Sequence, residues 1–233
     1  MSPPDILVYT APTMNGWKPL IFMEEAELPY ELEPINLSKA EQKSDAYLRL
    51  NPNGRIPTLV DRGRDDFVVF ESGAILWYLA QRYGVFLEAD IRVQSETLQW
   101  LMFQVGGVGP MMGQAMYFQR IAAPNGHELP FAIERYVKES RRLLEVLDRR
   151  LRDREWLAGT SFSVADIATY PWARTFAWAR VEVAGLEGLQ AWLDRIDARP
   201  GVQRALRLPK PMPAFFGARD PSFEAENAAR FRP

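Results

Sequence analysis

The sequence predicts a small mixed α/β domain followed by an all-helical domain. Between residues 5 and 84, short strand-like runs alternate with helical runs in the order βαβ, then α, then ββα. From residue 91 to residue 207, the apolar residues recur with a helical period only. The last stretch, residues 208–233, is rich in Pro, Ala and Arg and has little periodicity, so we expect an irregular tail. The predicted domains are therefore residues 1–84 and 91–207.

Four short runs predict the strands of the first domain. They lie at residues 5–10, 30–36, 58–61 and 67–70. The first run stops at Ala11-Pro12, as a buried strand does before a proline. The last two flank the charged turn at residues 62–66, which indicates a β-hairpin.

Helical spacing predicts the helices of the first domain. We expect one helix from about Trp17, a helix or irregular turn at residues 39–50, and a helix through residues 75–83 that ends near Gly84. The Asn-Pro-Asn-Gly segment at residues 51–54 is typical of a turn.

The second domain shows longer helical patterns. Residues 133–151 and 189–196 keep apolar residues on one face, with Glu and Arg between them. Ser163 and Asp166 match a capping box at the start of another helix. Residues 99–114 contain several Gly and Met residues, which indicates a helix that is broken or closely packed at glycines. The methionines fit either core packing or an adaptable apolar site.

The composition is that of an ordinary globular protein with no basic footprint. The chain has 233 residues, 47% of them hydrophobic and 25% charged, with 28 basic and 30 acidic side chains. A net charge of −2 argues against nucleic acid and anionic membrane surfaces as partners. No charged and then apolar leader is seen, and no apolar run approaches the roughly 20 residues of a membrane span. We therefore expect a cytoplasmic protein.

The chain has no cysteine, which excludes several kinds of site. Disulfides, thiolate zinc sites, CxxC redox motifs and cysteine nucleophiles are all absent. His127 is the one histidine, and it lies in a polar segment, which predicts an exposed loop residue and removes support for histidine triads and multi-histidine metal sites.

The segment between the first strand and the first helix is the first candidate for chemistry. Thr13 and Asn15 lie there, at the carboxyl end of a strand, where α/β folds usually bind ligands. Their side chains and the unpaired N–H groups of the helix favour a thiolate, because hydrogen-bond donors and a helix N-terminus lower the pKa of a thiol. The alternative is that both residues only cap the helix.

Two further segments indicate a peptide-like ligand. Pro57 precedes a strand, and a cis bond there would turn the main chain of Ile56 outward to pair with an extended peptide, although an ordinary turn proline is the alternative. Ser72 is a predicted N-cap, and the same helix N-terminus can receive a carboxylate, while Glu71 offers a counter-charge to an ammonium. A group that carries both charges is an α-amino acid.

Taken together, these motifs resemble those of the cytosolic glutathione transferases over residues 5–207. The resemblance rests on Pro-Thr-x-Asn-Gly at residues 12–16, the run from Asn51 to Asp61, Phe-Glu-Ser-Gly-Ala-Ile at residues 70–75, and the capping box in an all-helical half. Within the superfamily, residues 11–16, 98–100 and 104–111 resemble the bacterial Nu class, the disulfide-bond reductase type, and the related fungal nitrogen-regulator-like branch.

The resemblance implies a thioredoxin-like N-terminal domain and a helical-bundle C-terminal domain in a homodimer that binds glutathione and needs no metal. By motif, Ile56 before a cis Pro57 would pair with the cysteinyl main chain, and Glu71 with Ser72 would hold the γ-glutamyl end. Thr13 and Asn15 would face the sulfur, in place of the Tyr, Ser or Cys of other classes. Further implied glutathione contacts are Gln42, Arg55 and Arg135, although Lys is more usual where this chain has Arg55. Tyr9 lies inside the first strand and receives no such role.

The predicted activity is glutathione-dependent thiol–disulfide exchange, with organic hydroperoxides as further substrates. Two alternatives remain open: conjugation of glutathione to electrophiles, and a non-catalytic binding or regulatory role. The acceptor substrate cannot be read from the sequence, nor can the number of glutathione molecules that bind in each site.

Overall fold

The computed structural model describes residues 3–210, which form two compact units. Of the described residues, 3–88 and 197–210 make the first unit, and 89–196 make the second. The predicted tail lies outside the described residues except for positions 208–210.

A four-stranded mixed sheet forms the centre of the first unit. Its strands are β1 (Ile6–Thr10), β2 (Tyr30–Pro34), β3 (Thr58–Asp61) and β4 (Phe67–Phe70), in the spatial order β2-β1-β3-β4. β1 pairs with β2 in parallel and with β3 antiparallel, and β3 pairs antiparallel with β4. The predicted strands and hairpin are confirmed.

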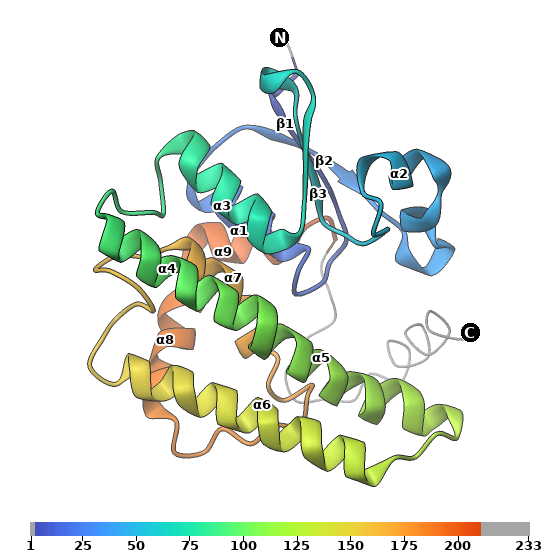
Figure 1. Ribbon diagram of the computed structural model, residues 1–233, viewed down its shortest axis with the longest axis vertical. Helices are drawn as coiled ribbons and strands as arrows, with labels where there is room; N and C mark the ends of the chain where they lie inside the picture. Colours follow the sequence, from blue (N-terminus) through green and yellow to red (C-terminus); the bar gives the residue numbers. More distant parts are fainter. Residues whose placement is uncertain (1–2, 211–233) are drawn as a thin grey trace. The chain divides into compact units, whose positions relative to one another are not determined.

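Helices cover both sides of this sheet. α1 (Trp17–Glu25) and α3 (Ser72–Tyr83) lie on one side, and α2 (Asp45–Leu50) lies on the other (Figure 1). Two short 3-10 turns, Leu37–Lys39 and Glu41–Lys43, precede α2. α3 ends at Gly84, whose φ of 68° is the left-handed conformation that glycine adopts freely. The predicted α/β order is therefore confirmed.

The core of the first unit lies between the sheet and the two helices on its one side. Apolar side chains from β1, α1, β3 and α3 are fully buried there: Ile6, Val8, Leu20, Ile21, Leu59, Ile75, Leu76 and Leu79. Burial of each such side chain stabilises the fold by about 1.5–3 kcal/mol. This core fixes the strand ends and helix starts on which the candidate site is built.

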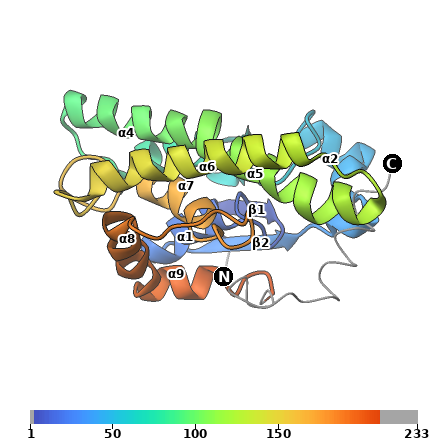
Figure 2. The same cartoon turned by 90° about the horizontal axis from the view of Figure 1, so that it is seen from below.

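All regular secondary structure in the described residues of the second unit is helical. It contains α4 (Ile91–Phe103), α5 (Gly109–Tyr117), α6 (Pro130–Leu151), α7 (Val164–Ala173) and α8 (Glu187–Asp197). Figures 1 and 2 show the α4–α5 run beside α6. None of the described helices is long and apolar enough to cross a membrane.

The glycine-rich segment of the second unit is both irregular and closely packed. A π-helical turn, Gln104–Val108, joins α4 to α5, and a second one, Phe118–Ala122, follows α5. A Cβ built on Gly109 would lie 2.7 Å from Nε2 of Gln104 and 3.4 Å from the Trp172 ring, so a larger residue here would have to displace the Gln104 side chain. Met112 and Met116 are buried, as the core-packing interpretation expects.

Asp166 joins three segments of the helical unit. It completes the predicted capping box with Ser163 at the start of α7. Its carboxylate also accepts the N–H of Leu157 at 3.0 Å and the indole N–H of Trp192 at 2.9 Å. Burial raises the pKa of this carboxyl, and the hydrogen bonds oppose that shift. The contacts explain a structural role for the capping box.

Residues 197–210 group with the sheet, which differs from the predicted domain boundary at residue 207. The backbone N–H of Val202 in α9 (Pro200–Ala205) donates to Glu25 Oε1 at 3.0 Å. Glu25 also pairs with Arg199, and Glu24 pairs with Arg204. These contacts hold α9 against the end of α1, because Glu24 and Glu25 accept hydrogen bonds and ion pairs from α9 and the residue before it.

Candidate functional site

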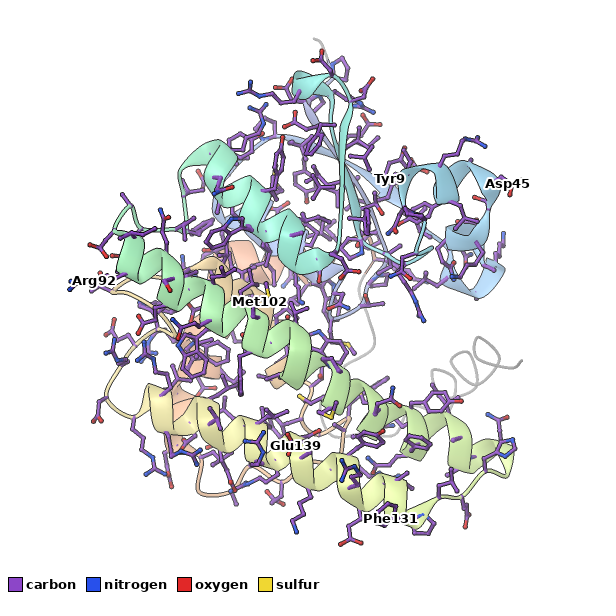
Figure 3. The ribbon with its side chains drawn as sticks, in the orientation of Figure 1. Tyr9, Asp45, Arg92, Met102, Phe131 and Glu139 are labelled. Atoms are coloured by element: carbon purple, nitrogen blue, oxygen red, sulfur yellow. The ribbon has the colours of Figure 1, made fainter. Side chains whose placement is uncertain are left out.

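The sheet register brings three loops to one end of the first unit. Tyr9 of β1 lies opposite Thr58 of β3, and Thr58 lies opposite Phe70 of β4. Three connections therefore leave the sheet at the same end of the strands: the one after Tyr9, the one before Thr58 and the one after Phe70. Tyr9 itself stays within the strand (Figure 3), where its ring meets that of Tyr47 edge to face, with 6.0 Å between centroids.

Thr13 stabilises the turn before α1 and keeps a proton to donate. Its hydroxyl oxygen accepts the N–H of Gly16 at 3.0 Å, and its carbonyl accepts the N–H of Trp17 at 2.9 Å. A hydroxyl has one donor and two acceptor positions, so this bond leaves the O–H proton available. Gly16 is the N-cap of α1 and no described side chain caps this helix, so the Thr13 hydroxyl stabilises the turn before α1, and this bond does not use the donor that a ligand would need.

Gly16 closes the same loop tightly. A Cβ at this position would lie 2.0 Å from the carbonyl oxygen of Ala11 and 2.6 Å from Oγ1 of Thr10. The Thr10 hydroxyl donates to the carbonyl of Gly16 at 2.9 Å. Asn15 lies one residue before, half-buried, and its carbonyl accepts the N–H of Lys18 at 3.3 Å. The loop is therefore set by close backbone packing, which fixes where Thr13 and Asn15 lie.

The second loop contains the cis peptide bond between Ile56 and Pro57. Two buried side chains hold the loop at Arg55: the hydroxyl of Tyr47 and the amide of Asn51 each donate to its carbonyl at 2.8 Å. Sequence reasoning missed Tyr47 and Asn51 as supports of this loop. Asn51 was part of the predicted turn, whereas nothing local marks Tyr47.

Several polar groups of this loop region face no protein partner. Within residues 3–210, the structure gives the main chain of Ile56 no hydrogen bond. Gln42 Oε1 is buried and has no hydrogen-bond partner in the same part of the chain. Arg55 is exposed. A buried acceptor without a partner and an unpaired peptide unit are the groups that an extended ligand can satisfy.

The third loop carries a strained residue, Glu71, before α3. Its φ of 70° and ψ of 115° are unusual for a residue other than glycine. The side chain is exposed, and the amide of Asn53 lies 3.5 Å from its carboxylate. The predicted N-cap at Ser72 is wrong, because Glu71 occupies the N-cap position and Ser72 is the first residue of α3. The helix therefore begins one residue earlier than the usual preference for serine as an N-cap suggests.

Lys18 reaches Ser72 from α1 and was not predicted from the sequence. Its side chain is 1% exposed, and Nζ donates to Ser72 Oγ at 3.1 Å. Burial lowers the pKa of Lys18 to about 7, and the charge of Glu71 opposes that shift. The signal that sequence reasoning missed is its helical spacing from Ile21, which places Lys18 on the buried face of α1.

Arg135 belongs to the second unit and is exposed on α6. A hydrogen bond from Arg142 lowers the pKa of Glu139, and the charge of Arg135 adds to the effect. Figure 3 labels Glu139 on the same helix. The role of Arg135 stays a prediction. In the described part of the chain, no three acidic or histidine side chains cluster as metal ligands would.

The arrangement in the first unit suits a small zwitterionic peptide. A hydroxyl donor stands at the end of β1, an unpaired peptide unit stands before β3, and a carboxylate adjoins the N-terminus of α3. A helix N-terminus favours a carboxylate, and the side chain of Glu71 favours an ammonium.

Comparison with known proteins assigns both parts of the chain to one family. Residues 4–81 match the family model for the glutathione S-transferase N-terminal domain, and residues 131–200 match that for the C-terminal domain. The Disulfide-bond oxidoreductase YfcG of Escherichia coli is 45% identical over 203 residues, which cover 85% of this chain and 93% of that protein.

Solved structures agree with this assignment. A glutathione transferase from Burkholderia graminis, with two glutathione molecules bound per subunit, has a TM-score of 0.84 and 40% identity, covering 89% of each chain. A glutathione transferase from Pseudomonas putida, with one glutathione disulfide bound per subunit, has a TM-score of 0.83 and 40% identity, covering 88% of this chain and 92% of that one. The chain therefore belongs to the glutathione S-transferase family.

Proposed function

We propose that this protein is a glutathione-dependent thiol–disulfide oxidoreductase. The observation that carries the proposal is a site suited to a zwitterionic peptide in a chain that contains no cysteine. Any thiol chemistry at this site must use sulfur from the ligand. The likeness to an E. coli protein named as a disulfide-bond oxidoreductase supports the same reaction class.

Glutathione fits the groups of the first unit. Its γ-glutamyl carboxylate is received by the N-terminus of α3 at Ser72, and its ammonium by Glu71. Its cysteinyl peptide unit pairs with the main chain of Ile56, beside Pro57. The structure supports this placement because Ile56 has no main-chain partner within the described residues.

Two further side chains extend this glutathione site. Gln42 offers a buried acceptor to an N–H of the ligand, and Arg55 offers a cation to the second carboxylate.

Thr13 and Asn15 act on the sulfur. The O–H of Thr13 donates to the thiolate, and the amide of Asn15 is the second donor. Both lie beside the start of α1, whose partial positive charge also favours an anion. Donors aimed at the charged form lower the pKa of a thiol, and each unit of lowering corresponds to about 1.4 kcal/mol. The protein thus increases the fraction of bound glutathione that is nucleophilic at neutral pH.

The reaction needs two glutathione molecules for each disulfide. The first thiolate attacks one sulfur of the substrate, the substrate's S–S bond breaks, and the leaving thiolate takes a proton from solvent. A second glutathione thiolate attacks the glutathione sulfur of the mixed disulfide, and oxidised glutathione and the second substrate thiol are released. The two-glutathione complex of the Burkholderia graminis protein and the glutathione disulfide complex of the Pseudomonas putida protein support this sequence.

Other features of the proposal concern class, assembly and location. We place the protein in the Nu class, as a cytoplasmic homodimer that also reduces organic hydroperoxides. Support for the dimer comes from the edge strand β4, where Phe67 and Phe70 are 52% and 39% exposed. Apolar side chains on an unpaired edge favour association.

Steady-state turnover with a small model disulfide tests the reaction. Bis(2-hydroxyethyl) disulfide is reduced with glutathione, and oxidised glutathione is measured through glutathione reductase. We expect turnover of the disulfide to exceed conjugation of an aryl halide at the same enzyme concentration. The reverse ranking would assign a conjugating transferase, and binding of glutathione without either turnover would assign a non-catalytic role.

Asn15→Ala tests the active-site assignment in the same assay. We expect a loss of disulfide turnover that exceeds any loss of folding stability, because Asn15 donates to sulfur. The matched control is Asn125→Ala, since Asn125 is an exposed residue of a 3-10 turn in the second unit, and its amide donates within that unit, to the carbonyl of Ile121 at 2.7 Å. Wild-type turnover in the Asn15 variant would remove this residue from the mechanism.

A further inference from the structure

A fully buried lysine contacts Ser72, one of the two residues proposed to hold the γ-glutamyl end of glutathione. Lys18 is 1% exposed, and lysine is almost never fully buried unless it is paired. Its Nζ donates to Ser72 Oγ at 3.1 Å, and Ser72 is the first residue of α3. Burial of an ammonium costs free energy that hydrogen bonds and charges must offset, and the bond to Ser72 connects Lys18 to the proposed ligand site.

We propose that Lys18 is a positioning residue for glutathione. Its ammonium holds the hydroxyl of Ser72 so that the hydroxyl proton points to the ligand's carboxylate, and it balances the charge of Glu71. The inference rests on the proposed function, because it places the γ-glutamyl end at Glu71 and Ser72.

The direction of the hydrogen bonds follows from donor and acceptor counts. An ammonium has three donors and no acceptor, whereas a hydroxyl has one donor and two acceptor positions. Once Lys18 donates to Ser72 Oγ, the proton of Ser72 is directed to another acceptor. A neutral amine can instead accept that proton, which would turn the hydroxyl away from the ligand. The charge of Lys18 therefore decides whether Ser72 donates to a carboxylate.

The electrostatic surroundings make this charge sensitive to the ligand. Burial lowers the pKa of Lys18 to about 7, and Glu71 acts in the opposite direction. Other charged groups on α1, α3 and the α9 segment form pairs elsewhere: Glu24 with Arg204, Glu25 with Arg199, and Arg82 with Asp61. A carboxylate bound at Ser72 adds a negative charge beside Lys18 and favours its protonated form. Ligand binding near neutral pH therefore takes up a proton.

Calorimetry with S-methylglutathione tests this coupling in the wild-type protein. The probe keeps both carboxylates and the ammonium but has no thiol to titrate. Titrations between about pH 6 and about pH 8, in buffers of different ionisation enthalpy, give the affinity and the number of protons taken up. We expect fractional proton uptake near pH 7 and an affinity that falls by up to about tenfold per pH unit above it. Binding with neither proton uptake nor pH dependence would overturn the role of Lys18.

Lys18→Met assigns the proton to its residue. We expect weaker binding at pH 6 and loss of the proton uptake, which a merely structural role would not produce. His127→Asn replaces the one histidine of the chain, an exposed residue of the second unit, and as the matched control it should retain the uptake. Uptake that persists in Lys18→Met also overturns the inference. If Lys18→Met does not fold, the uptake in the wild type and in His127→Asn decides the question. Failure of the wild type to bind the probe at any pH would instead overturn the proposed function.

Discussion

Glu71 combines a strained backbone with a charge that the proposed ligand needs, so its replacement should separate stability from binding. Its φ of 70° is unfavourable for any residue with a Cβ, at a cost of about 1–3 kcal/mol. Glycine at this position removes that strain but loses about 0.5–1 kcal/mol to the greater freedom of the unfolded chain. We therefore expect Glu71→Gly to raise the free energy of unfolding by about 1 kcal/mol.

The same substitution should weaken glutathione binding. A hydrogen bond to a charged group contributes about 1.5–3 kcal/mol, and its loss corresponds to about a 10- to 100-fold weaker affinity. Glu71→Gln is the comparison variant, because it keeps the strained backbone and loses only the charge. It should therefore bind weakly without any gain in stability.

Urea unfolding and calorimetry with S-methylglutathione measure the two quantities on the same samples. The reasoning is refuted if Glu71→Gly is less stable than the wild type, or if Glu71→Gln binds as tightly as the wild type. The first result would mean that the backbone at Glu71 is not strained. The second would mean that its carboxylate does not hold the ligand's ammonium.

Three further predictions concern the supports of the site. Gly16→Ala should lower both the affinity for glutathione and the free energy of unfolding, because its Cβ would lie 2.0 Å from the carbonyl oxygen of Ala11. Gly106→Ala is the control and should change neither, because a Cβ there would have no described atom within 4 Å. Calorimetry measures the affinity, and urea unfolding measures the stability. Tyr47→Phe removes one of the two donors to the Arg55 carbonyl, so it should cost about 0.5–1.5 kcal/mol of stability and raise the KM for glutathione. Urea unfolding and steady-state kinetics measure both, and an unchanged KM contradicts this support role. Burial lowers the pKa of Lys18 in the folded protein to about 7, so above that pH the unfolded chain binds more protons and the free energy of unfolding should rise with pH. Urea unfolding of Lys18→Met should lack this rise. Equal dependence of the unfolding free energy on pH in the variant and the wild type argues against a buried titrating lysine.

The elements that local chemistry specifies could be predicted from the sequence. The hairpin around residues 62–66, the end of α3 at Gly84 and the capping box at Asp166 depend on residues close together in the chain. The motifs around Thr13, Ile56 and Glu71 identified the three loops that meet at one end of the sheet.

Features that depend on distant residues could not be predicted in this way. The association of α9 with α1 depends on Glu24 and Glu25, and a helical pattern does not show which helix it packs against. The frequency of serine at caps predicts an N-cap at Ser72, yet Glu71, with its positive φ, occupies the N-cap position and Ser72 is the first helical residue. The helical spacing marks Lys18 as buried, but its contact with Ser72 could not be predicted, because the two residues are 54 positions apart in the chain.

The central claim is that the protein lowers the pKa of a thiol that belongs to its ligand. Ultraviolet absorbance of the thiolate measures this pKa directly. It is followed against pH with the protein in excess over glutathione, so that all of the glutathione is bound. We predict a titration midpoint for bound glutathione at least one unit below that of free glutathione, and a return toward the free value in Thr13→Val and Asn15→Ala. A midpoint for bound glutathione equal to that of the free tripeptide would contradict the claim.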